Sequence, residues 1–144
     1  AVYSSGTQQK VPQDLALNFE KQSGTYGVEN VYRRYPRAPL DVEVILHNNQ
    51  EVLWGRSIDV SEKGSFIHLD SPGDFRLGQE VTAIFRNIPS GVGTTSTPAV
   101  IMRVINEPPG YGLFFLNINP RLRRQLASYV ITQLRAQYAQ AKVG

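Results

Sequence analysis

Two short clusters hold the residues whose types and spacing could bind a ligand, and the first is Arg33-Arg34-Tyr35-Pro36-Arg37. Pro36 restricts its own φ angle and disfavours a helical Tyr35, so this segment is expected to be extended. In an extended chain Arg33 and Arg37 share one face, about 13 Å apart, and Arg34 lies on the other. Two guanidinium forks at this spacing suit a polyanion or a ligand with two separated acceptor groups.

The second cluster follows 22 residues after Arg37 and consists of Asp59, Ser61 and Gly64. These residues lie where a predicted strand ends, and strand alternation puts Asp59 and Ser61 on the same face. Gly64 allows a positive φ that would close the loop. An arginine fork can read the O6 and N7 edge of guanine, and a carboxylate can accept from the N1 and N2 hydrogens of guanine. Each cluster alone also fits a simpler interpretation, a solvated basic linker or an ordinary turn.

Composition limits the protein class. The chain has 144 residues, 41% of them hydrophobic, a net charge of +3 and no cysteine. This predicts one domain that buries its own core, with neither disulfides nor thiolate metal sites. The positive excess is too small and too local for a general nucleic-acid binder. No apolar run approaches the ~20 residues of a membrane helix, so no membrane insertion is expected. The polar start at Ala1 shows no signal peptide and is consistent with a piece of a longer protein.

A two-residue hydrophobic period dominates the middle of the chain. Strands are predicted over residues 42–47, 52–60, 66–69, 81–85, 99–105 and 111–118. Turn residues separate them, and residues 91–98 are interpreted as a long hairpin loop. Because no helix intervenes, the pattern predicts an antiparallel barrel or sandwich. Trp54 and the other aromatic residues are expected in the barrel core or in cross-strand pairs.

The two ends of the chain differ from this middle part. Residues 1–31 are predicted to form an N-terminal extension, either flexible or with a short helix near residues 12–19. Asn119 and Pro120 favour the start of a long helix, which defines a segment 119–144 after a barrel of residues 32–118. Its apolar stripe should cover an open end of the sheet or pair with a second copy in a homodimer. Its arginines are interpreted as a solvated face.

The order of the two clusters resembles the PilZ domain, the bacterial receptor module for cyclic di-GMP. The resemblance rests on Arg33-x-x-x-Arg37 followed, after one strand pair, by Asp59-x-Ser61-x-x-Gly64. It extends over about residues 32 to 135. Further similar features are Pro39, Arg76-Leu77-Gly78, the strand of residues 99–104 and Tyr111-Gly112-Leu113-Phe114-Phe115.

The resemblance implies a mainly β fold, a six-stranded antiparallel PilZ-type barrel with a C-terminal α-helix. The arginine segment would wrap over the ligand, and six residues would bind cyclic di-GMP: Arg33, Arg34, Arg37, Asp59, Ser61 and Gly64. Neither a cofactor nor a metal is implied. Between Ser61 and Gly64 this chain carries Glu62 and Lys63, where hairpins of the family often carry small residues.

The function implied is that of a receptor that changes conformation on binding the nucleotide and so regulates a protein partner or a covalently attached effector domain. Its place would be the bacterial cytoplasm, either alone or as the cytoplasmic part of a larger protein. One alternative is a PilZ-like protein-interaction module that binds no nucleotide. A barrel for single-stranded RNA is a third, but it would interleave aromatic and basic residues, and only Tyr35 does so near the arginines.

Catalysis is not expected. His47 and His68 have a spacing that fits no metal-binding helix motif. Asp59, Ser61 and His68 include the residue types of a hydrolytic triad, but Ser61 lacks the Gly-x-Ser-x-Gly elbow. No pair of carboxylates stands in the isolated contexts that a glycosidase needs. The sequence therefore predicts a binding domain without catalytic residues.

Overall fold

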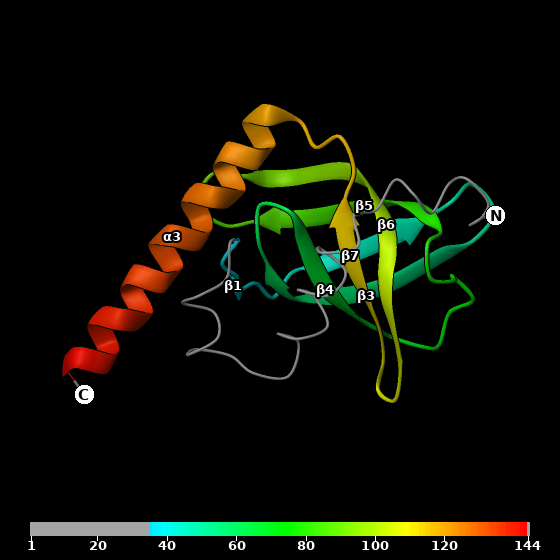
Figure 1. Ribbon diagram of the computed structural model, residues 1–144, viewed down its shortest axis with the longest axis horizontal. Helices are drawn as coiled ribbons and strands as arrows, with labels where there is room; N and C mark the ends of the chain where they lie inside the picture. Colours follow the sequence, from blue (N-terminus) through cyan, green and yellow to red (C-terminus); the bar gives the residue numbers. More distant parts are fainter. Residues whose placement is uncertain (1–34, 144) are drawn as a thin grey trace.

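The computed structural model describes residues 35–143, which form seven strands and one helix (Figure 1). The elements in chain order are β1 (Ala38–Pro39), β2 (Glu43–His47), β3 (Val52–Val60), β4 (Gly64–Leu69), β5 (Glu80–Ile88), β6 (Gly93–Asn106), β7 (Pro109–Phe115) and α3 (Pro120–Val143). The helix expected near residues 12–19 lies outside the described residues. Within residues 35–143 no helix is both long and apolar enough to cross a membrane.

The strands close into a barrel. Their order is β1-β3-β2-β5-β6-β7-β4, and β4 also pairs with β3, so β2 to β7 form a closed six-stranded antiparallel barrel. The predicted mainly β fold with a C-terminal helix is confirmed. β1 is an additional short strand that pairs with the end of β3, with Ala38 opposite Val60. The prolines around it therefore keep this segment extended, as expected.

Strand β6 is longer than its hydrophobic pattern suggests. The prediction of a long loop over residues 91–98 is wrong, because β6 begins at Gly93 and pairs with β5 from there. Thr95 lies opposite Phe85 and Thr97 opposite Ala83. β-branched threonines suit strands, and Thr97 is buried although its side chain is polar. The polar composition of this stretch concealed a strand.

The inner face of the barrel carries the hydrophobic core. Strands β2, β4, β6 and β7 supply its most buried side chains, among them Leu46, Ile67, Ile101 and Leu113. Of the two positions expected for Trp54, the core and a cross-strand pair, the structure shows the second. Its side chain is 45% exposed on the outer face of β3, and it pairs across the strands with Ile45.

The first half of α3 closes one end of the barrel. Asn119 is the N-cap, because its Oδ1 accepts a hydrogen bond from the backbone N–H of Arg121 at 2.8 Å. Leu122, Leu126 and Val130 belong to the core, and the Tyr129 hydroxyl donates to the Pro39 carbonyl at 2.9 Å. Burial raises the pKa of Tyr129. The prediction that the apolar stripe covers an open end of the sheet thus holds for this half of α3, and the second half extends beyond the barrel (Figure 1).

We predict that Tyr111→Phe destabilises the barrel by about 1–3 kcal/mol. The Tyr111 hydroxyl accepts a hydrogen bond from the backbone N–H of Phe75 at 3.0 Å in a buried setting, so its removal leaves that donor unsatisfied. The measurement is urea unfolding followed by circular dichroism. Thr132→Val is the control, because it removes the hydroxyl of an exposed residue of α3. Equal unfolding midpoints for Tyr111→Phe and the parent chain would contradict the prediction.

Candidate functional site

A β-bulge in β3 sets the position of Asp59. The register between β3 and β4 shifts between Ser57 and Asp59, so Ser57 lies opposite Ile67 and Asp59 opposite Phe66. Ile67 belongs to the core, whereas Phe66 lies outside the core cluster. Bulges re-aim side chains in this way. Asp59 is thereby moved out of the alternation that sends Ser57 inward.

Asp59 and Arg37 form a buried ion pair. Arg37 Nη1 donates to both carboxylate oxygens of Asp59, at 3.1 and 3.3 Å, and each side chain is 8% exposed. Asp59 Oδ1 also accepts from the backbone N–H of Phe66 at 3.0 Å. A buried carboxylate requires such partners, because an uncompensated charge away from water is strongly destabilising. The fold therefore brings together one arginine of the first cluster and the aspartate of the second.

Ser61 shapes the turn between β3 and β4. Its Oγ accepts hydrogen bonds from the backbone N–H groups of Lys63 and Gly64, both at 3.1 Å, and its side chain is buried. The Ser61 N–H donates to the Gly64 carbonyl at 2.8 Å. The expectation of a positive φ at Gly64 is wrong, since Gly64 already belongs to β4 and pairs with Phe114. The turn is closed by the serine hydroxyl, not by a left-handed glycine.

Of the six predicted ligand residues, the structure describes Arg37, Asp59, Ser61 and Gly64, which lie at one place around the β3–β4 turn. Arg33 and Arg34 lie outside the described residues. Ser57 was not predicted from the sequence as part of this region. Its buried Oγ accepts a hydrogen bond from the Val42 N–H at 3.0 Å and donates one to the Leu40 carbonyl. Ser57 thereby fastens the chain that follows the arginine segment. Ser57 precedes Asp59 by two residues, the period of a strand, and this spacing is the feature of the sequence that could have indicated it.

Phe66 covers the neighbouring outer face. A Cβ on Gly110 would meet the Phe66 ring at 2.9 Å, and a Cβ on Gly112 would meet the Cβ of Arg103 at 3.0 Å. Both glycines belong to β7, opposite His68 and Phe66 of β4. Gly110 therefore leaves room for the ring of Phe66, and Gly112 leaves room for the side chain of Arg103.

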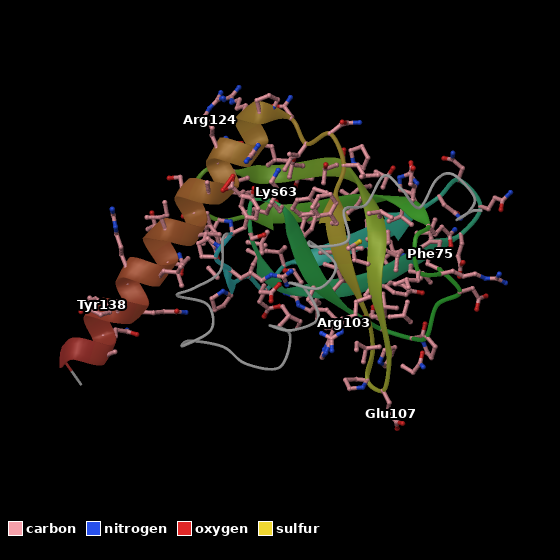
Figure 2. All side chains as sticks on the ribbon, viewed as in Figure 1. Lys63, Phe75, Arg103, Glu107, Arg124 and Tyr138 are labelled. Carbon is pink, nitrogen blue, oxygen red and sulfur yellow. The ribbon has the colours of Figure 1, made fainter. Side chains whose placement is uncertain are left out.

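The two residues between Ser61 and Gly64 connect the turn with other elements. Glu62 accepts a hydrogen bond from Arg123 Nε of α3 at 2.7 Å, and this contact raises the pKa of the Arg123 guanidinium. The Lys63 ammonium lies 5.3 Å from the ring centre of Tyr35, a cation–π distance. Figure 2 shows Lys63 where the barrel faces α3. The turn thus contacts both the helix and the end of the arginine segment.

The described residues 35–143 contain no group of three or more His, Cys, Asp and Glu side chains that could hold a metal ion. An open depression on the outer face of β3 and β4 lies beside the bulge. Its lining consists of Asp41, Arg56, Ser57, Ile58, His68, Leu69 and Asp70. The Arg37–Asp59 pair is not part of this lining, so the ligand motif and the hollow are adjacent but distinct.

Comparison with known proteins assigns the fold and the motif to one family. The family model of the PilZ domain matches residues 32–132. The chain belongs to the PilZ domain family. Both clusters of the candidate site fall inside the matched range, from Arg33 to Gly64. A search of the curated proteins found no match.

Solved PilZ structures share the fold at low sequence identity. The inhibitor of motility MotI/DgrA of Bacillus subtilis aligns with a TM-score of 0.63 and 23% identity, over 72% of this chain and 51% of that chain. The PilZ domain of YcgR from Escherichia coli, solved with cyclic di-GMP, aligns with a TM-score of 0.59 and 20% identity, over 76% of this chain and 97% of that domain. The longer YcgR chain from the same organism, also in complex with cyclic di-GMP, gives 0.60 and 21%, over 76% and 49%. This chain therefore spans about half the length of MotI and of the longer YcgR chain.

We predict that Asp59→Ala destabilises this PilZ domain by about 3–5 kcal/mol, because Arg37 then keeps its buried charge without the carboxylate. The double variant Arg37→Met/Asp59→Leu should recover part of the loss, since apolar residues can replace a buried ion pair. Urea unfolding of the parent, Arg37→Met, Asp59→Leu and the double variant measures the coupling.

Asp41→Ala serves as the matched control for this cycle. It removes the 2.6 Å ion pair with Arg56, in which the Asp41 side chain is 81% exposed. Exposed ion pairs contribute little, so the unfolding midpoint should hardly change. Additive effects of the Arg37 and Asp59 substitutions would show that the two side chains do not stabilise each other.

Proposed function

We propose that this PilZ domain is a receptor for cyclic di-GMP that changes conformation on binding and so regulates a partner protein or an attached domain in the bacterial cytoplasm. The observation that carries the proposal is the meeting of Arg37 and Asp59, two motif residues 22 positions apart, in one buried contact. Structures of YcgR with cyclic di-GMP support the ligand class. PilZ domains are regulatory binding modules, which agrees with a receptor that is not an enzyme.

The chemistry of the site suits a guanine nucleotide. The Asp59 carboxylate can accept from N1–H and the N2 amino group of a guanine, and the Arg37 fork can donate to O6 and N7 or to a phosphate. Arg33 and Arg34 add donors for the second half of the dinucleotide in this proposal. Ser61 and Gly64 hold the turn in shape, since the hydroxyl of Ser61 and the backbone of Gly64 bond to each other.

Arg37 and Asp59 bind each other in the structure, and this is why nucleotide binding would change the conformation. Arg37 is 6% exposed, Asp59 5% and Ser61 2%. A nucleotide that uses Arg37 and Asp59 must exchange or share their mutual contact, and a new position of Arg37 would displace the segment that carries it. Because this segment precedes β1, its displacement can reorient whatever lies N-terminal to the barrel.

We predict that the chain binds cyclic di-GMP saturably in isothermal titration calorimetry and that Arg37→Ala weakens binding at least tenfold. Each charge-assisted contact to a charged ligand group is worth about 1.5–3 kcal/mol, and 1.4 kcal/mol corresponds to a factor of ten. GTP and a short single-stranded RNA are the ligand controls. The stoichiometry distinguishes one nucleotide per site from a stacked pair.

Two further variants separate lost binding from lost folding. Arg86→Ala removes an exposed arginine that pairs with Glu43 at 2.9 Å, and it should leave the affinity unchanged. Arg33→Ala tests the other motif arginine without removing the partner of Asp59. No heat and no thermal shift with saturating cyclic di-GMP would refute the proposal and favour a PilZ-like module that binds only protein.

The turn offers a route from the nucleotide to α3. Glu62 and Lys63 lie between two motif residues, and they contact Arg123 of α3 and Tyr35 of the arginine segment, respectively. The Lys63 carbonyl also accepts from the Phe115 N–H at 2.8 Å, which ties the turn to β7. A displacement of the arginine segment would therefore reach the start of the helix through neighbouring side chains.

We predict that Glu62→Gln keeps nucleotide affinity within about threefold but reduces the response of α3. The neutral amide weakens the contact with Arg123 while Asp59 and Ser61 stay unchanged. Hydrogen exchange of the α3 amides with and without cyclic di-GMP is the measurement. Glu43→Gln, which weakens the Arg86 pair instead, is the control. If α3 responds equally in both variants and in the parent, the Glu62–Arg123 contact does not transmit the change.

A further inference from the structure

Helix α3 carries a continuous exposed stripe on the side opposite the barrel. The residues that pack on the barrel are Leu122, Leu126, Tyr129 and Val130. Successive residues of an α-helix are rotated by 100°, so these four residues lie on one side of α3. A second set of residues, spaced alternately by three and four positions, lies on the opposite side. This set, here called the outer stripe, consists of Arg121, Arg124, Ser128, Ile131, Arg135 and Tyr138, all of which are exposed.

All charged residues of this helix are cationic. From Pro120 to Val143 it contains five cationic residues and no acidic residue. Arg123, which lies off the stripe, pairs with Glu62, whereas Arg121, Arg124 and Arg135 form no ion pair with any residue in the range 35–143. Cations near a helix N-terminus oppose the helix macrodipole. Helix stability therefore does not account for Arg121 and Arg124.

The spacing of the stripe matches a helix-packing seam. Alternating steps of three and four residues place side chains along the line where two helices meet in a coiled coil. One set of seam positions holds Arg121, Ser128 and Arg135, and the other holds Arg124, Ile131 and Tyr138. Ile131 is 46% exposed and Tyr138 66% exposed, so the seam combines charge with two apolar contacts. Figure 2 shows Arg124 and Tyr138 near the two ends of α3, outside the barrel.

The charges distinguish between the possible occupants. A second copy packed through the same stripe would bring arginines against arginines, which is unfavourable. A membrane surface requires a broad apolar face, and the stripe has only Ile131 and Tyr138 as large apolar side chains. A helix with carboxylates opposite the arginines and aliphatic side chains opposite Ile131 and Tyr138 satisfies both the charge and the spacing.

We propose that the outer stripe of α3 is the docking surface for an acidic amphipathic helix of a partner protein. The stripe from Arg121 to Tyr138 is about 26 Å long, so a partner helix of about 18 residues would cover it. The contact would lie along the part of α3 that extends beyond the barrel as well as along the part that closes it. This proposal does not depend on nucleotide binding.

The test uses the full chain and a designed peptide as the probe. The peptide has four heptads with Glu at every a position and Leu at every d position, and fluorescence anisotropy measures its binding. The stripe variant is Arg124→Gln/Arg135→Gln. The matched control is Gln137→Glu/Gln140→Glu, which changes the net charge of the same helix equally at two exposed positions off the stripe. We expect at least tenfold weaker binding for the stripe variant and less than a twofold change for the control.

Four results would overturn the proposal. Equal binding of a peptide with the same composition but a scrambled heptad would show attraction by charge alone. Equal loss of binding in the stripe variant and the control would show that the whole helix, not the stripe, attracts the probe. Sedimentation that shows a dimer dissociated by Ile131→Glu, or binding to phosphatidylglycerol vesicles tighter than to the peptide, would assign the stripe to a second copy or to a membrane surface.

Discussion

A carboxylate removed from water needs a partner, and the contact between Asp59 and Arg37 meets this constraint at the centre of the candidate site. The contact depends on the bulge in β3, which moves Asp59 out of the inward alternation, and on the pairing of β1 with the end of β3, which brings Arg37 close. The Phe66 N–H adds a second fixed donor from β4. Three strands thus converge on one side chain, and the closed barrel holds them in place.

The same arrangement would allow a rigid barrel to respond to the proposed ligand. Its core is a closed set of packed strands, so the barrel itself has little freedom to respond. The ion pair, by contrast, joins strand β3 of the barrel to Arg37, which directly precedes β1. A ligand that competes for either partner acts on that segment rather than on the core. Such a division between a fixed scaffold and a replaceable contact is what a receptor domain requires.

Helix α3 belongs to both parts of this description. Its first half is a component of the core through Leu122, Leu126 and Val130, and it contacts the motif turn through Arg123 and Glu62. Its second half extends beyond the barrel with exposed side chains. One rigid element therefore reaches from the motif turn to a surface on which another protein could act. The low identity to the solved structures of MotI and YcgR shows that the fold is retained although most of the aligned residues differ.

The strand pattern, the capped helix and the two motif clusters could be predicted from the residues alone, because periodicity, N-cap chemistry and residue spacing are local properties. The residues alone did not reveal that residues 93–98 form a strand. The threonines of this stretch stand in a turn-like context, and their secondary structure depends on pairing with β5. The position of Trp54 on the outer face and that of Gly64 inside β4 likewise depend on the register of the strands, which follows from barrel closure. Only the tertiary structure showed that Arg37 and Asp59 share a buried contact and that Glu62 reaches α3. Local signals specify which elements form, whereas contacts between distant residues depend on how the whole sheet closes.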